Sequence, residues 1–104
     1  MAWTWLISAG LLEILFATFL KLSEGFTKPL YTVAFAVAGV LSFYFLTKAM
    51  QTIPLGTAYA VWTGIGAVGV VILGVVLFSD PVTLPRLFFL TTLVVSIVGL
   101  KLVS

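Results

Sequence analysis

Four apolar stretches, each long enough to cross a lipid bilayer as a helix, occupy most of this sequence. They cover about residues 3–20, 30–47, 55–78 and 84–103, and short connections rich in turn-forming residues separate them. A membrane-spanning helix needs about 20 predominantly apolar residues. We therefore expect an all-α integral membrane protein with a single transmembrane domain of four helices. Strands of a β-barrel would instead alternate apolar and polar residues.

The composition argues against a soluble fold for a chain of this size. Of its 104 residues, 62% are hydrophobic and 8% are charged, whereas soluble domains carry about 25% charged residues. A soluble fold this small has too little interior to cover so much apolar surface. The net charge of +2 comes without a basic cluster, so we expect no nucleic-acid partner.

The sequence contains no cysteine and no histidine, which narrows its possible chemistry. Their absence removes thiolate nucleophiles, histidine bases and the common zinc sites. There is also no phosphate-binding P-loop motif. We therefore expect no enzymatic activity, no catalytic residue, no metal and no cofactor, and active transport would have to draw on an ion gradient.

The positive charges give no clear orientation in the bilayer. Lysine and arginine in short loops favour the cytoplasmic side. One side holds Lys21, Lys28 and Arg86, and the other holds Lys48, Lys101 and the N-terminal amine. Two interpretations stay open. Either a weak bias selects one orientation, or the chain inserts both ways and can form an antiparallel dimer from one gene.

Glu13 is an ionisable residue in the middle of the first apolar stretch. Burying an ionised carboxylate at bilayer depth is costly, so such residues usually face a cavity and serve a function. No lysine or arginine lies at comparable depth, so the chain offers no structural ion pair. We expect Glu13 to hold a proton or an organic cation in turn, as proton-coupled antiport requires. The alternative is a permanently protonated side chain that bonds a neighbouring helix.

Three residues could complete a binding site around Glu13. Gly10 and Phe16 lie three positions before and after it on the same helical face, where they would provide room and an aromatic wall. Ser42, in the middle of the second stretch, could donate a hydrogen bond to Glu13. A serine that bonds a carbonyl of its own helix is the alternative.

The third stretch carries a second candidate face, formed by Tyr59, Trp62, Thr63 and Gly66 at helical spacing. Aromatic faces attract cations, and a tyrosine hydroxyl can bond a carboxylate or a ligand. An aromatic belt at the membrane interface is the alternative explanation for Tyr59 and Trp62. The glycines Gly64 and Gly66 weaken helix preference, so we expect a conformational kink there.

Small residues in the fourth stretch predict a contact between helices. Thr92 and Ser96 stand four residues apart, and Gly99 follows. Such spacing lets helices approach closely in lipid. Four short helices leave little room for a polar pathway, so we expect a second copy to pack here and supply the missing walls.

The sequence resembles the small multidrug resistance family over its whole length. The matching segments are Gly10–Glu13, Leu20–Thr27 and Ile53–Gly66. The resemblance implies a proton-coupled exporter of organic cations in the bacterial inner membrane. It also implies an antiparallel dimer in which both copies of Glu13 bind either substrate or protons, with Ser42, Tyr59 and Trp62 around them.

Different parts of the chain are similar to different branches of that family. Thr57–Gly69 and Gly99–Lys101 resemble the guanidinium-exporter branch, whereas Leu22–Lys28 is closer to the quaternary-ammonium branch. The first branch usually has tryptophan in place of Phe16, and phenylalanine lacks the indole N–H donor. The family tends to have a small residue in place of Phe89, and bulky residues there occur in members that work as paired, non-identical subunits.

The preferred functional expectation is proton-coupled export of guanidinium and related small guanidinyl cations. The planar donor fork of a guanidinium matches a carboxylate. The second is multidrug export of quaternary ammonium or hydrophobic cations, which bind through aromatic faces. The third is one subunit of a heterodimer with a paralogue of the same family, or an accessory membrane protein with no transport of its own.

Overall fold

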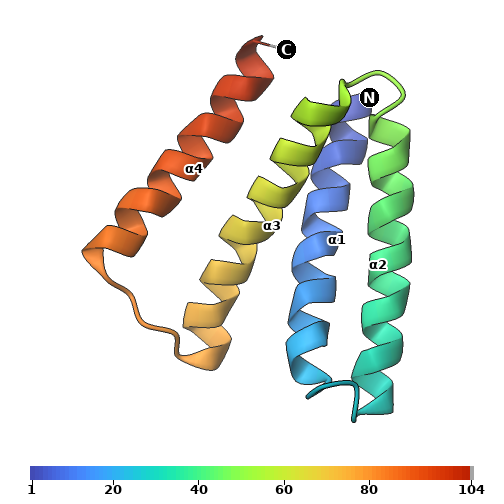
Figure 1. The fold of residues 1–104 in the computed structure, drawn as a ribbon, viewed down its shortest axis with the longest axis vertical. Coiled ribbons are helices and arrows are strands. Elements are labelled where there is room, and N and C mark those ends of the chain that lie inside the picture. Colours follow the sequence, from blue (N-terminus) through green and yellow to red (C-terminus); the bar gives the residue numbers. More distant parts are fainter. Residues whose placement is uncertain (104) are drawn as a thin grey trace.

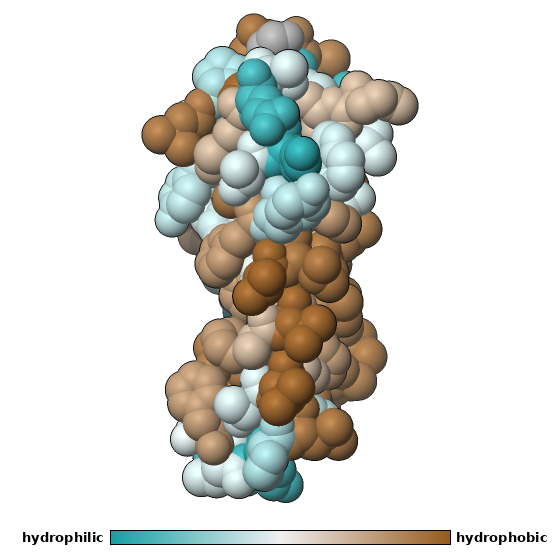
Figure 2. All heavy atoms as spheres, turned by 90° about the vertical axis from the view of Figure 1, so that its right-hand side faces the viewer, coloured by the Kyte–Doolittle hydropathy of each residue, from teal (hydrophilic) through white to brown (hydrophobic). Residues whose placement is uncertain are grey.

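The chain forms four long helices joined by short loops (Figure 1). The computed structural model describes residues 1–103, and the helices are α1 (Ala2–Leu22), α2 (Pro29–Ala49), α3 (Leu55–Phe78) and α4 (Leu84–Val103). No strand occurs among these residues, which confirms the all-α expectation. All four helices are long and apolar enough to cross a membrane. Figure 2 shows the corresponding pattern on one face, with apolar side chains across the middle and hydrophilic ones at both ends.

Two helices are longer than the apolar stretches that predicted them. The ends of α3 and α4 coincide with those of their stretches, whereas α1 and α2 continue past theirs into the flanking lysines. Lys21 and Lys48 lie in the last turns of these helices, where a cation interacts favourably with the helix dipole. Hydropathy therefore predicts the apolar part of α1 and α2, whereas their helical backbone hydrogen bonds continue into the last turns, which contain lysine.

The loops at one end of the bundle contain backbone in the left-handed region. In the loop between α1 and α2, φ is +48° at Glu24, +71° at Gly25 and +66° at Phe26. The buried Ser23 hydroxyl supports this turn, since it donates to the Leu20 carbonyl at 2.6 Å and accepts the Phe26 N–H at 3.2 Å. The tight turn brings α2 back alongside α1.

Packing is uneven across the four helices. α1 packs most extensively on α2 and next on α3, and the small core includes Leu6, Ala9, Val61 and Trp62. α4 packs mainly against α3, and no residue in its described range is buried. Figure 1 shows α4 standing apart from the other three helices. The chain therefore has a packed three-helix unit and a fourth helix that is largely uncovered.

Candidate functional site

The carboxylate of Glu13 lies in the seam between α1 and α3. Its oxygen Oε1 occupies the space that a side chain at position 66 would need, so a Cβ atom added to Gly66 would overlap it. Oε1 is buried, and it accepts no hydrogen bond from any residue in the described range 1–103. A buried acceptor without a donor is unfavourable, so this oxygen is suited to a proton or a ligand with N–H groups.

Glycines on both helices set the register of α1 against α3. The Ile14 side chain fills the space beside Gly69, just as Glu13 fills the space beside Gly66. In the opposite direction, Ile65 fills the space beside Gly10, where an added Cβ would lie 2.7 Å from Ile65 Cγ2. The sequence predicted that Gly10 would leave room beside the carboxylate, but the Ile65 side chain takes that space.

Ser42 links three helices through a buried hydrogen-bonded chain. Its hydroxyl accepts the indole N–H of Trp62 at 3.0 Å and donates to the Ala9 carbonyl at 2.7 Å. Helix geometry makes that carbonyl the acceptor for the backbone N–H of Glu13 as well. Ser42 therefore bonds neither Glu13 nor its own helix, contrary to both expectations, and it acts on the backbone one turn before Glu13.

A continuous series of aromatic rings extends from α1 through α2 to α3. The Phe16 ring lies 5.9 Å from that of Phe35 and 6.1 Å from that of Phe43. Phe43 in turn lies 5.7 Å from Trp62, which lies 5.7 Å from Tyr59. An aromatic ring attracts a cation that lies over its exposed face. Tyr59 and Phe43 are each 54% exposed, so this aromatic face is open on the monomer.

Two members of this series, Phe35 and Phe43, were missed by the sequence analysis. Both lie on α2, whereas Phe16 lies on α1, and no spacing within one helix reports a contact between two helices. The signal that did exist was the high aromatic content of the second stretch, and it could not be assigned to a face. The hydrophobic pattern of α2 marks no single side as buried.

The remaining candidates on α3 have local partners or neighbours. The Thr63 hydroxyl donates to the Tyr59 carbonyl at 2.8 Å, within its own helix. An added Cβ at Gly64 would lie 2.6 Å from Ile97 Cδ1, so this glycine admits a side chain of α4. α3 is helical through both Gly64 and Gly66, and the kink expected there stays a prediction.

The small residues of α4 face away from the packed helices. Thr92 and Ser96 are exposed, and their hydroxyls donate to carbonyls of α4 itself at 3.0 and 2.9 Å. No atom lies within 4 Å of a Cβ added at Gly99. Phe89 is 67% exposed. This surface is open in one chain, and its contact with a second copy stays a prediction.

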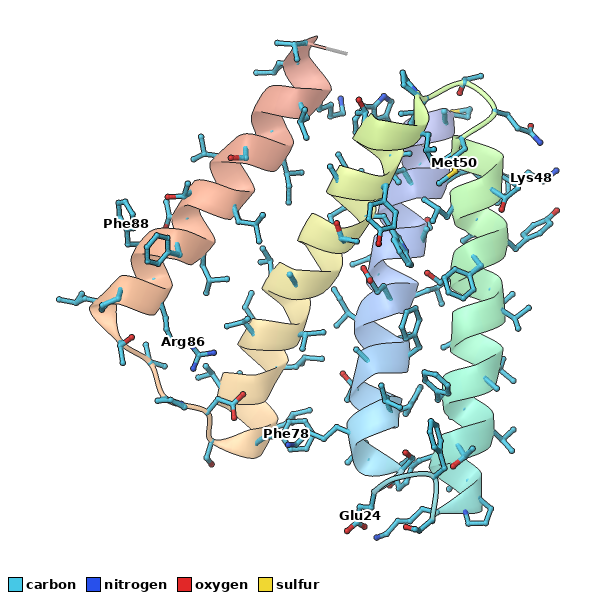
Figure 3. The ribbon with its side chains drawn as sticks, in the orientation of Figure 1. Glu24, Lys48, Met50, Phe78, Arg86 and Phe88 are labelled. Carbon is cyan, nitrogen blue, oxygen red and sulfur yellow. The ribbon has the colours of Figure 1, made fainter. Side chains whose placement is uncertain are left out.

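Charged groups other than Glu13 collect at the two ends of the molecule. Figure 3 shows Glu24 at one end, Lys48 near the other, and Arg86 beside the start of α4. Within residues 1–103, the ion pair between Lys28 and Glu24, at 2.7 Å and exposed, is the only one. Glu13 thus has no cationic partner among the described residues.

Comparison with known proteins gives one consistent family. The family model described as Small Multidrug Resistance protein matches residues 1–93. A "Guanidinium exporter" of Yersinia pseudotuberculosis serotype I (strain IP32953) is 48% identical over 104 residues, which is 100% of each chain. That of Proteus vulgaris is 45% identical over 104 residues, again 100% of each chain. That of Citrobacter freundii is 46% identical over 102 residues, 98% of this chain and 97% of its own.

Proposed function

Because the chain belongs to the small multidrug resistance family, we propose that it exports guanidinium and related small guanidinyl cations in exchange for protons. The observation that carries this proposal is the buried Glu13 Oε1, which has no donor among residues 1–103. A guanidinium offers a planar fork of N–H donors that can bond both oxygens of a carboxylate. Full-length relatives named "Guanidinium exporter" point to the same substrate.

Competition for one carboxylate supplies the coupling. Glu13 can carry a proton or hold the cation, and the two occupancies exclude each other because both use the same lone pairs. The cost of leaving a carboxylate ionised and unpaired at bilayer depth disfavours the empty state. A transporter that changes access only when Glu13 is occupied would therefore exchange protons for guanidinium.

Each neighbour of Glu13 has a proposed part in binding. Gly66 sets the position of the carboxylate, and the chain from Trp62 through Ser42 to the Ala9 carbonyl holds the adjacent turn of α1. The open ring faces, among them that of Tyr59, attract the cation. Gly10, Phe16 and Thr63 shape the surrounding wall, and a kink at Gly64 and Gly66 would support alternating access.

The working unit in this proposal is an antiparallel homodimer in the bacterial inner membrane. One chain exposes both its aromatic face and the face of α4 that carries Thr92, Ser96 and Gly99. A second copy would cover these surfaces and enclose the two carboxylates. The near balance of positive charges at the two ends permits insertion in both orientations.

Two alternatives rest on specific residues. The aromatic wall around Phe16, formed with Phe35 and Phe43, suits quaternary ammonium or hydrophobic cations, which have no N–H donors. The exposed Phe89 on α4 would fit a heterodimer with a family paralogue better than a close contact between identical helices.

Uptake of radiolabelled cations by proteoliposomes with an acidic interior distinguishes these functions. The proposal predicts guanidinium uptake by vesicles containing this chain alone, weak uptake of tetraethylammonium, and no uptake with Glu13→Gln. Comparable uptake of both cations would favour the multidrug exporter. If the folded wild-type protein takes up neither cation alone but becomes active when a paralogue is added, the heterodimer is favoured.

A further inference from the structure

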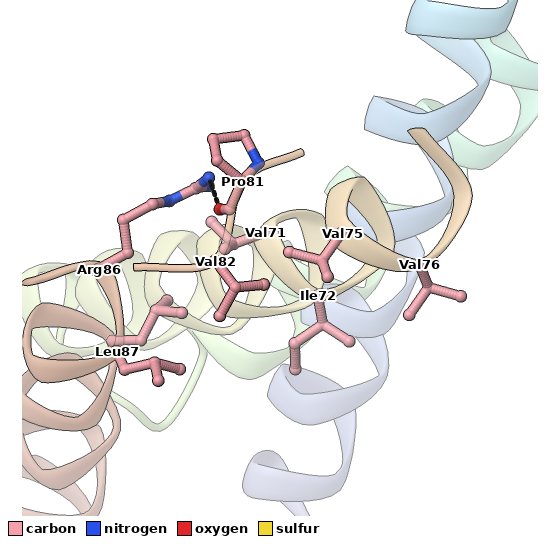
Figure 4. A pocket seen from close by; sticks show the side chains of 9 residues that line it. Val71, Ile72, Val75, Val76, Pro81, Val82, Arg86 and Leu87 are labelled. Carbon is pink, nitrogen blue, oxygen red and sulfur yellow. Dashed lines mark hydrogen bonds between the residues drawn. The ribbon is translucent and has the colours of Figure 1, made fainter. Parts of the chain in front are cut away.

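A series of apolar hollows follows the seam between α3 and α4. The first has a volume of about 190 Å³ and lies near the loop that joins these helices, with Val71, Val75 and Leu90 among its lining residues (Figure 4). The second, of about 350 Å³, shares Val71 and Leu90 with the first. A third, of about 260 Å³, shares no residue with the first two; it lies farther along α3 and α4, includes Val68 and Val94, and is also lined by Ile14 of α1.

The hollows follow one another along the α3–α4 seam, and one cation lies at the end near the loop. Their α3 residues extend from Val76 back to Ile65, which corresponds to roughly 16 Å at the helical rise. Arg86 lines both hollows nearest the loop, and the other residues that line these two carry no charge. An apolar groove with the Arg86 side chain near the start of α4 has the shape and polarity of a phospholipid site.

Arg86 has most of its hydrogen-bonding capacity left for an external anion. Its guanidinium donates to the Pro81 carbonyl, drawn as the dashed line in Figure 4, and a guanidinium has five N–H donors. No ion pair involves Arg86 within the described residues. Asp80 is turned to the other side, where it packs against Gly74 and lines a separate hollow.

The acidic residues of this chain give Arg86 no partner, even in an antiparallel dimer. The sequence has only three, Glu13, Glu24 and Asp80. Glu13 lies in the middle of α1, and Glu24 pairs with Lys28. An antiparallel copy would bring its loop of residues 50–54 to the Arg86 end, and that loop contains no carboxylate. No acidic side chain is therefore placed to pair with Arg86, whereas the bilayer interface supplies lipid phosphates.

We propose that the α3–α4 groove binds an anionic phospholipid, whose phosphate pairs with Arg86 and whose acyl chain lies along the apolar hollows. Arginine pairs with phosphate through two parallel hydrogen bonds. Figure 3 shows Arg86 reaching from the start of α4 toward α3, which places the cation at the mouth of the groove. The lipid would fill the seam that separates α4 from the rest of the chain and fix the position of that helix.

Native mass spectrometry of the purified dimer tests this site with two lipids of identical acyl chains, phosphatidylglycerol and phosphatidylcholine. Wild-type dimers should retain phosphatidylglycerol preferentially. Arg86→Gln should lower its occupancy by about fivefold or more and that of phosphatidylcholine, whose choline neutralises the phosphate, by less. Arg86→Lys should retain an intermediate preference. Lys28→Gln is the matched control, since it removes an exposed cation outside the groove, and it should change occupancy by less than about twofold.

Four outcomes would overturn the proposal. Equal occupancy by both lipids would show that Arg86 selects no headgroup. An equal loss of phosphatidylglycerol with Lys28→Gln and with Arg86→Gln would mean that general surface charge retains the lipid. Displacement of the lipid by millimolar inorganic phosphate would reduce the site to a simple anion site. Lipid bound to monomers and excluded from dimers would mean that a second copy occupies the groove.

Discussion

The Oε1 atom of Glu13 lies where a Cβ atom on Gly66 would stand, so a side chain at this position would displace the carboxylate. The contact joins the carboxylate of α1 to the middle of α3. Any movement of one helix along the other would therefore change the surroundings of this carboxylate. Gly66 is a positioning residue in this arrangement, because it sets where the charge of Glu13 can lie.

Gly66→Ala should reduce guanidinium transport by about tenfold or more, since the new methyl group displaces the carboxylate from its position. Alanine is a better helix former than glycine by about 1 kcal/mol, so helix propensity cannot cause the loss. Gly56→Ala is the matched control on the same helix, because nothing lies within 4 Å of the added Cβ. Equal transport by the two variants would contradict the positioning role of Gly66.

Ser42→Ala should destabilise the protein by about 1–3 kcal/mol, because it leaves the buried Trp62 N–H without an acceptor. Thermal unfolding in detergent measures this effect. Trp62→Phe removes the donor, so the double variant should lose less than the sum of the single losses. Thr47→Ala is the control, because that hydroxyl is exposed and bonds only its own helix. Additive losses of stability in the double variant would show that Ser42 and Trp62 do not act together.

Phe16→Trp should raise the ratio of guanidinium to tetraethylammonium transport, because it adds an N–H donor to the aromatic wall beside Glu13. Competitive uptake of the two cations in proteoliposomes measures this ratio. Phe19→Trp is a suitable control on the same helix, since its ring stacks on Tyr31 at 6.4 Å, outside the series that includes Phe43. An unchanged ratio in Phe16→Trp would remove Phe16 as a determinant of selectivity.

Charge changes that force one orientation should abolish export unless the opposite orientation is also present. Gln51→Lys with Thr52→Lys adds positive charge at one end, and Lys48→Gln with Lys101→Gln removes it there. Each double variant alone should fail to protect cells from guanidinium, and the two expressed together should restore resistance. Full resistance from either double variant alone would contradict the antiparallel dimer.

The fold was predictable from the sequence because bilayer thickness imposes a length on each apolar stretch. The middle of each helix follows from that constraint, whereas the ends of α1 and α2 do not, since their last turns contain lysine. Glu13 was predictable as a site residue from its cost in lipid. Its neighbours were harder, because contacts between helices depend on rotation about each helix axis.

Ser42 illustrates the limit of a sequence-based assignment. Its depth in α2 suggested a bond to Glu13, but its hydroxyl donates to the Ala9 carbonyl, one turn away. Gly66 is the converse case, because its spacing from Trp62 suggested a shared face without revealing the contact with Glu13. Both contacts join two different helices, and no single-helix pattern contains that information.

The most direct test of the central claim is whether guanidinium leaving a vesicle drives protons in through Glu13. Proteoliposomes are loaded with guanidinium and a pH-sensitive dye, then diluted into guanidinium-free buffer of the same pH. We predict acidification of the interior with wild-type protein and none with Glu13→Gln. Guanidinium efflux without acidification, or acidification that persists in Glu13→Gln, would contradict the exchange of proton and substrate on this carboxylate.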